Sequence, residues 1–225
     1  MGDRMAAVRA LAFAVVFAVS FSCTAAPFAV RLGDERIVLD APPGFADTLE
    51  LASPRLQELA ESLTPASNRI LLFALTDADL RRFSSGDTPE LLRYLLVATP
   101  RALERNSVGL SEFRAFAAEA LRGLGDPMAP GDLRAFLDTR PIGQPSLVRE
   151  LRRTPLFVSL LIATRLPPRT ETEPQYLLHT TTLMLVRGKA LSVSTYTRYR
   201  DASDADWLLD ATLRWTAELQ RLNGR

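Results

Sequence analysis

The stretch that decides the fold is residues 176–200, YLLHTTTLMLVRGKALSVSTYTRYR. Two runs rich in β-branched and aromatic residues flank Arg187 and Gly188, which is typical of two strands joined by a two-residue turn. The same stretch contains the only histidine of the chain, His179, and its only lysine, Lys189. It is open to two interpretations, a catalytic surface or an ordinary β-hairpin, and we favour the hairpin.

Pairing Val186 with Lys189 sets a register and divides the hairpin into two faces, because side chains alternate along a strand. One face is mostly apolar or β-branched and pairs Met184 with Leu191, Thr182 with Val193, Thr180 with Thr195, Leu178 with Thr197, and Tyr176 with Tyr199. The other face pairs Leu183 with Ser192, Thr181 with Ser194, and His179 with Tyr196. We expect the first face to lie under a helix and the second to be partly solvated.

A helix is predicted directly after this hairpin. Its apolar residues recur at helical spacing and form one face, at Leu208, Ala211, Trp215, Leu219 and Leu222. Ser203 and Asp206 have the spacing of a capping box, which predicts the start of the helix at Ser203. The run DASDAD lacks the spacing and the terminal glutamate of a calcium-binding loop, so we interpret it as helix capping.

The rest of the chain alternates short apolar runs with helical patterns. FAVRL and RIVLD predict a hairpin, Ser53 followed by Pro54 predicts a helix start, and Thr76 with Asp79 predicts another capping box. Strands are expected at 68–75 and 155–166 and a helix at 111–122, whereas 91–99 fits either element and we favour a strand over 94–99. Between 123 and 155 we assign only one helical turn. The fold class is therefore α+β, a largely antiparallel central sheet covered by helices, including the amphipathic C-terminal helix.

The first 26 residues differ in composition from the other residues. Arg4 and Arg9 precede an apolar run at 10–21, and small residues follow it, as in a secretory signal peptide. This run is shorter than the about 20 residues that a transmembrane helix needs. We expect cleavage after Ala25 or Ala26, an exported chain in the periplasm or outside the cell, and a single α+β domain at 27–225.

Cys23 is the only cysteine of the chain. Cleavage behind it removes every thiol from the mature protein, which excludes disulfides and thiol catalysis there. In the alternative, Cys23 is the lipidated first residue of a bacterial lipoprotein, and the protein contacts a membrane through that anchor. Of the three residues that precede Cys23 in such a signal, only Ser22 fits well.

Several function classes are disfavoured by composition. The formal net charge is +1, and the arginines at 81–82 and in RELRR at 149–153 have acidic neighbours, which predicts solvated faces and no nucleic-acid partner. One histidine cannot form a metal site of nitrogen and sulfur ligands, and the sequence holds no phosphate-binding loop or nucleophile elbow. We expect no cofactor and assign no catalytic residue. The only candidates are His179, Tyr196 and Ser194 on the polar face of the hairpin.

The final third of the chain resembles the end of PsbP-like α/β/α sandwich proteins, a superfamily that includes DcrB-type bacterial envelope proteins. The residues that carry the resemblance are the turn RGK, the strand end YTRYRD and the helix DADWLLDATLRWTAELQ, with APPGF after the first hairpin. It implies a small exported domain, usually non-catalytic, that binds or supports other envelope components. We accordingly expect a non-enzymatic periplasmic or envelope protein with an envelope protein as partner. The alternative is a small-ligand-binding protein or hydrolase that uses the polar face around His179 and Tyr196.

Overall fold

The structure is a computed structural model that describes residues 26–129, 131–168 and 174–224. The predicted leader, apart from residue 26, and Cys23 lie outside the described residues. Within those ranges, no helix has both the length and the apolar composition that a bilayer crossing requires.

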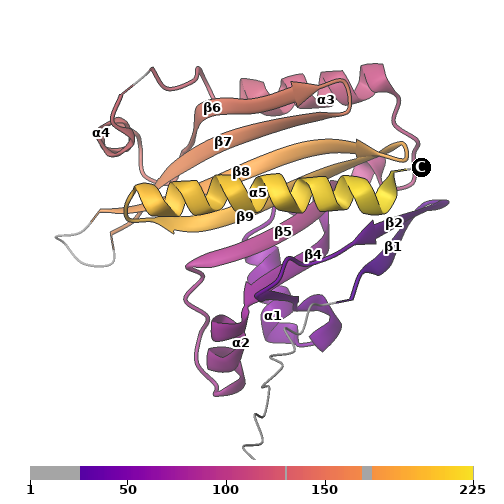
Figure 1. Cartoon of the computed structure of the whole chain (residues 1–225), viewed down its shortest axis with the longest axis horizontal. Helices are drawn as coiled ribbons and strands as arrows, with labels where there is room; N and C mark the ends of the chain where they lie inside the picture. Colours follow the sequence, from indigo (N-terminus) through magenta and orange to yellow (C-terminus); the bar gives the residue numbers. More distant parts are fainter. Residues whose placement is uncertain (1–25, 130, 169–173, 225) are drawn as a thin grey trace, which may run out of the picture.

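A seven-stranded, fully antiparallel sheet forms the centre of the molecule, in the order β3-β4-β5-β9-β8-β7-β6 (Figure 1). Its strands are β3 (Phe45–Asp47), β4 (Asn68–Thr76), β5 (Arg93–Pro100), β6 (Pro145–Thr154), β7 (Phe157–Leu166), β8 (Gln175–Val186) and β9 (Lys189–Tyr199). A separate hairpin consists of β1 (Phe28–Leu32) and β2 (Glu35–Leu39). The predicted α+β class with an antiparallel sheet is confirmed, as are the predicted strands.

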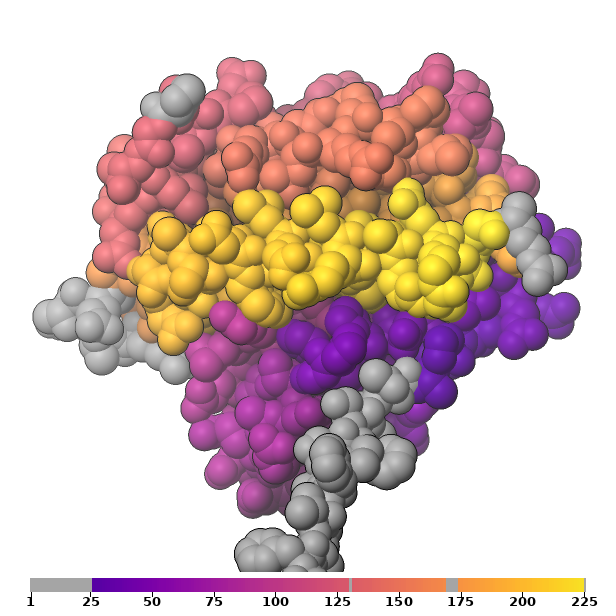
Figure 2. All heavy atoms as spheres, viewed as in Figure 1, coloured from indigo at the N-terminus to yellow at the C-terminus, as the bar shows by residue number. Residues whose placement is uncertain are grey.

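The helices are α1 (Pro54–Ser62), α2 (Asp77–Ser84), α3 (Leu110–Arg122), α4 (Leu133–Asp138) and α5 (Ala202–Asn223), with short 3-10 turns at Leu49–Leu51 and Arg101–Leu103. Helix α5 runs along β8 and β9 on one face of the sheet, and Figure 2 shows it between strands β6 and β7 and the β1–β2 hairpin. Helices α1 and α2 pack on β4 and α3 packs on β8, on the opposite face. The predicted C-terminal helix over the sheet is confirmed.

The β8–β9 hairpin has the predicted register, with Val186 opposite Lys189 and His179 opposite Tyr196. Its turn is the two-residue type that needs positive φ at both positions, and φ is 49° at Arg187 and 70° at Gly188. The face predicted to lie under a helix carries α5. At its centre the hydroxyl oxygens of Thr180 and Thr212 are 2.5 Å apart and both residues are buried.

Lys189 is a structural residue at the end of this hairpin. Its side chain is buried, and Nζ donates hydrogen bonds to the backbone oxygens of Asn106 (2.8 Å) and Glu104 (3.3 Å). The ammonium group therefore ties the loop before α3 to the hairpin, since a buried charge is stable only when polar groups surround it. These contacts give Lys189, one of the two residues in this stretch that favour a catalytic surface, a structural role.

The predicted capping box of α5 is wrong. The N-cap is Asp201, whose carboxylate accepts hydrogen bonds from the backbone N–H of Ser203 (2.9 Å) and from its hydroxyl (2.6 Å). Asp204 instead lies buried between two guanidinium groups, those of Arg93 (3.3 Å) and Arg200 (3.0 Å). Strand β9 ends at Tyr199, so the helix begins as soon as the chain has turned, and Ser203 already lies within its first turn.

Strand β6 lies within the region 123–155, where the sequence pattern predicted a single helical turn. That turn exists as α4, but β6 was missed. Two bulges interrupt its pairing with β7, between Leu147 and Arg149 and between Glu150 and Arg152. Each bulge inserts an extra residue and breaks the alternation of polar and apolar residues that identifies a strand in a sequence.

Candidate functional site

The structure brings the three candidate catalytic residues together on the sheet face opposite α5. The rings of His179 and Tyr196 stack with centroids 4.9 Å apart, and Tyr196 stacks in turn on Tyr94 from β5 at 4.3 Å. Tyr94 was not among the sequence candidates, because nothing local indicates that β5 pairs with β9. The three rings form a row across neighbouring strands that links β5, β9 and β8.

The chemistry of this row is that of a neutral, largely buried imidazole. Burial lowers the pKa of His179 to about 4 and raises the pKa of Tyr196. Nδ1 of His179 is shielded from solvent and has no hydrogen-bond partner within the described part of the chain. The hydroxyl of Ser194 lies 3.0 Å from that of Thr181. His179 thus contacts Tyr196 through ring stacking, and the catalytic role of the three residues stays a prediction.

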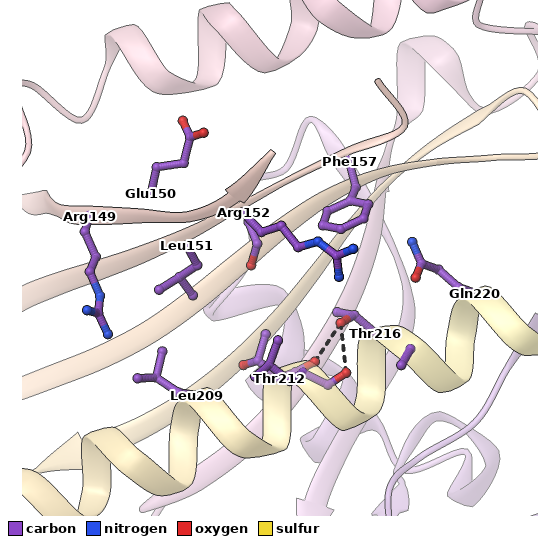
Figure 3. A pocket seen from close by; sticks show the side chains of 12 residues that line it. Arg149, Glu150, Leu151, Arg152, Phe157, Leu209, Thr212, Thr216 and Gln220 are labelled. Atoms are coloured by element: carbon purple, nitrogen blue, oxygen red, sulfur yellow. Dashed lines mark hydrogen bonds between the residues drawn. The ribbon is translucent and has the colours of Figure 1, made fainter. Parts of the chain in front are cut away.

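A second feature is a groove of about 350 Å³ on the opposite face, between α5 and the edge strand β6 (Figure 3). We call it the α5–β6 groove. Its lining comes from β6, β7 and α5 and consists of Arg149, Glu150, Leu151, Arg152, Phe157, Ser159, Leu209, Thr212, Leu213, Thr216, Ala217 and Gln220. Figure 3 shows Arg149, Leu151 and Arg152 on the β6 side, facing α5, whereas Glu150 points away from the helix.

The bulges of β6 place both arginines on this face. In a regular strand, residues 149 and 152 would point to opposite sides of the sheet. Arg149 instead pairs with Leu161 and Arg152 with Ser159, two positions of β7 that share a face because they are two residues apart. Glu150 points to the other side, where its carboxylate binds the guanidinium of Arg153. The bulged strand thus places Glu150, the acid between the two groove arginines in the sequence, on the other side of the sheet.

The polar groups of the groove floor are already hydrogen-bonded. Ser159 bonds to the hydroxyl of Thr182 at 2.8 Å, and the hydroxyl of Thr212 lies within hydrogen-bond distance of Thr180 and of the backbone oxygen of Leu208. These hydroxyls therefore present little unmet hydrogen-bonding capacity to a ligand.

The two arginines are the charged groups that remain available in the α5–β6 groove. Both are exposed, and the guanidinium of Arg152 lies over the ring of Phe157, 5.0 Å from its centroid. Among the residues that the structure describes, neither arginine takes part in an ion pair. The groove therefore combines a largely apolar floor, whose hydroxyl groups are hydrogen-bonded within the protein, with a positively charged wall, which is complementary to an occupant that is both apolar and acidic.

A metal centre finds no support in the described ranges, which contain no group of three or more histidine, cysteine, aspartate or glutamate side chains placed to hold an ion. The acidic run at the start of α5 illustrates why. Asp201 caps the helix and Asp204 binds two arginines. These carboxylates are close together in the sequence, but each is bound to different groups of the protein.

Comparison with known proteins identifies no family. No protein-family model matches the chain, and no curated protein matches it. Among solved structures, the chain is similar to the Saccharomyces cerevisiae Ran-binding protein Mog1p, with a TM-score of 0.38, 13% identity, and coverage of 88% of this chain and 92% of that one. A mutant of Mog1 gives the same TM-score and identity, with 93% of its chain covered. A TM-score of this size supports no inference about function, and the resemblance to PsbP-like proteins stays a prediction.

Proposed function

We propose that this protein is an exported, non-enzymatic component of the bacterial envelope that binds a partner protein in the α5–β6 groove. The observation that carries the proposal is the pair Arg149 and Arg152, two exposed guanidinium groups without an ion-pair partner in the described residues, beside an apolar floor. The occupant that fits is a peptide segment with apolar side chains on one side and carboxylates toward β6.

The length of the groove favours a peptide over a compact ligand. Its α5 residues extend from Leu209 to Gln220, and at 1.5 Å per residue the helix covers about 17 Å there. That distance accommodates about three helical turns or five residues of an extended chain. Leu213, 60% exposed at the rim of the groove, is the apolar residue that such a segment would cover.

Photo-crosslinking in cells tests the proposal directly. A photoreactive phenylalanine analogue at position 213 reports on the groove, and the same analogue at Leu110, 46% exposed on α3, reports on the opposite face. We expect a discrete crosslinked protein at position 213 and none at 110. The double variant Arg149→Glu/Arg152→Glu should remove the crosslink, because it repels an acidic segment.

The matched control is Arg36→Glu/Arg114→Glu, which changes the net charge equally at two exposed arginines outside the groove. It should leave the crosslink intact. Mass spectrometry of the crosslinked peptide then identifies the occupant, which we expect to be acidic and amphipathic. A crosslink that survives charge reversal, a second copy of this chain, a lipid, or no crosslink at position 213 would each contradict the proposal.

Export and anchoring are tested separately, by the mass of the mature N-terminus. The signal peptide predicts a chain that begins at Ala26 or Pro27. A chain that begins at a diacylated or triacylated Cys23 would establish the lipid-anchored form of the same proposal. A full-length chain in the cytoplasm would contradict export without affecting the assignment of the groove.

A further inference from the structure

A second cavity, of about 580 Å³, lies between α5 and the segment that follows β2. Its lining is largely aromatic and aliphatic and consists of Asp40, Pro42, Pro43, Phe45, Leu95, Trp207, Ala211, Arg214, Trp215 and Glu218. Both tryptophans of the chain are among these residues. The indole N–H of Trp215 donates to the backbone oxygen of Asp40 at 2.7 Å, which holds this segment against the helix.

The charges around this cavity are paired except for one. Glu218 accepts two hydrogen bonds from the guanidinium of Arg221, at 2.8 and 2.5 Å, and Arg214 is 2.6 Å from Asp210. Asp40 forms no ion pair within the described ranges, and its Oδ1 is shielded from solvent without a hydrogen-bond donor. Burial, and secondarily the negative charge of Glu218, raise the pKa of the Asp40 carboxyl group. The site therefore holds a carboxylate without an ion pair, whose charge the Ala41 backbone N–H and the more distant Arg221 offset only in part, and whose Oδ1 lacks a hydrogen-bond donor.

We propose that this cavity binds an organic cation that carries N–H groups, a primary ammonium or a guanidinium on an apolar stem. The charged group would donate a hydrogen bond to the carboxylate of Asp40, and the stem would lie against the rings of Phe45 and Trp215. Indole and phenyl rings attract such cations through their faces. Trp207 already does so within the protein, where the guanidinium of Arg93 lies 4.1 Å from the ring centroid.

The wall of the cavity also explains why the cation needs an apolar part. Pro42, Pro43 and Leu95 offer no hydrogen bonds through their side chains, so a fully hydrated inorganic ion would lose its water shell without compensation. An alkyl chain loses nothing by entering such a space, because burial of apolar surface is favourable.

Tryptophan fluorescence measures binding at this site, since both indoles line it. The probes are n-butylammonium and n-butylguanidinium, each titrated at ionic strength held constant with sodium chloride. 1-Butanol is the neutral comparison, and choline is a cation without N–H groups. We expect a saturable fluorescence change with the first two, no saturable change with 1-butanol, and weaker binding of choline.

Two variants locate the binding. Asp40→Asn keeps the shape of the side chain and removes its charge, and we expect it to weaken n-butylammonium binding about tenfold. Ala211→Leu fills part of the cavity and should weaken binding independently of charge, which keeps the test decisive if one variant folds poorly. The control Asp34→Asn removes an exposed carboxylate in the turn between β1 and β2 and should leave binding unchanged.

Three results would overturn the proposal. They are equal responses to n-butylammonium and 1-butanol, an unchanged affinity in both Asp40→Asn and Ala211→Leu, or no saturable response to either N–H cation. None of them bears on the α5–β6 groove, which is formed by different residues of α5.

Discussion

Replacing Asn223 by alanine should destabilise the protein far more than a substitution in the last turn of a C-terminal helix normally does. Its side chain is buried, and its amide group bonds both the N–H and the C=O of Val38 in β2, as the backbone of a neighbouring strand would. Oδ1 accepts the N–H of Val38 at 2.8 Å, and Nδ2 donates to the backbone oxygens of Val38 (2.7 Å) and Leu219 (2.9 Å). One amide thus connects the end of α5 to the β1–β2 hairpin.

The magnitude follows from the three hydrogen bonds. Each contributes about 1 kcal/mol net, and the groups of Val38 that lose their partner are partly buried, which adds to the cost. We expect Asn223→Ala to lower the free energy of unfolding by about 3 kcal/mol. For a domain of this size that corresponds to a fall in Tm of about 6–12 °C.

Urea unfolding followed by circular dichroism measures this loss, with an unchanged m-value as evidence that the unfolded state is not altered. Hydrogen exchange should show the amides of β1 and β2 losing protection more than those of β8 and β9, because the hairpin is held by α5. Asn223→Asp keeps the acceptor but places a negative charge beside the Val38 oxygen, and should cost at least as much at pH 7.

The matched control is Asn106→Ala. Its side chain is exposed and makes one long hydrogen bond, 3.4 Å to the backbone oxygen of Ala102. We expect this variant to change stability by less than about 0.5 kcal/mol. If Asn223→Ala were as mild as the control, or if exchange rose uniformly over the whole sheet, the reasoning that Asn223 connects α5 to the hairpin would be refuted.

Three further variants probe other buried or half-buried groups. Thr212→Val removes the bond to Thr180 and should lower the unfolding free energy by about 1–2 kcal/mol in a urea titration; no loss would show that the pair is not stabilising. Burial lowers the pKa of His179 from 6.5 to about 4, so the unfolded chain binds a proton first as the pH falls, and stability is lost between pH 6.5 and 4. Between pH 7 and 5 the wild type should lose on the order of 1–2 kcal/mol more than His179→Phe, which keeps a ring in the stack, and equal slopes would contradict a neutral buried imidazole. Asp204→Asn weakens the hydrogen bonds that the buried carboxylate accepts from Arg93 and Arg200 and should cost about 2 kcal/mol, because water can solvate the partly exposed guanidinium groups, whereas the exposed Asp206→Asn should cost little in the same assay.

The hairpin at the centre of the sheet could be predicted in detail because its signals are local. The alternation of residues along β8 and β9 fixes two faces, and a two-residue turn at Arg187 and Gly188 leaves one register that keeps those faces intact. The apolar face of α5 follows from spacing within the helix alone, and Leu208, Trp215 and Leu219 are buried as predicted.

The candidate sites could be predicted only in part. The proximity of His179, Tyr196 and Ser194 follows from the hairpin register, but the stacking of Tyr94 on Tyr196 depends on β5 lying beside β9, a pairing between segments about a hundred residues apart. The sequence pattern predicts a solvated face for the arginines of RELRR. They are exposed, but the sequence does not indicate that Arg149 and Arg152 share one side of the sheet.

The sequence by itself therefore determined the elements whose pattern repeats within a few residues, which are the alternating strands, the amphipathic helix and the turn between β8 and β9. The tertiary structure decided what lies between elements. The bulges of β6 turn Arg149 and Arg152 toward α5, and the packing of α5 on the segment after β2 shields Oδ1 of Asp40 from solvent. Such features depend on contacts between segments that are far apart in the sequence. These contacts stabilise the protein only once both segments have come together, so no local sequence pattern indicates them.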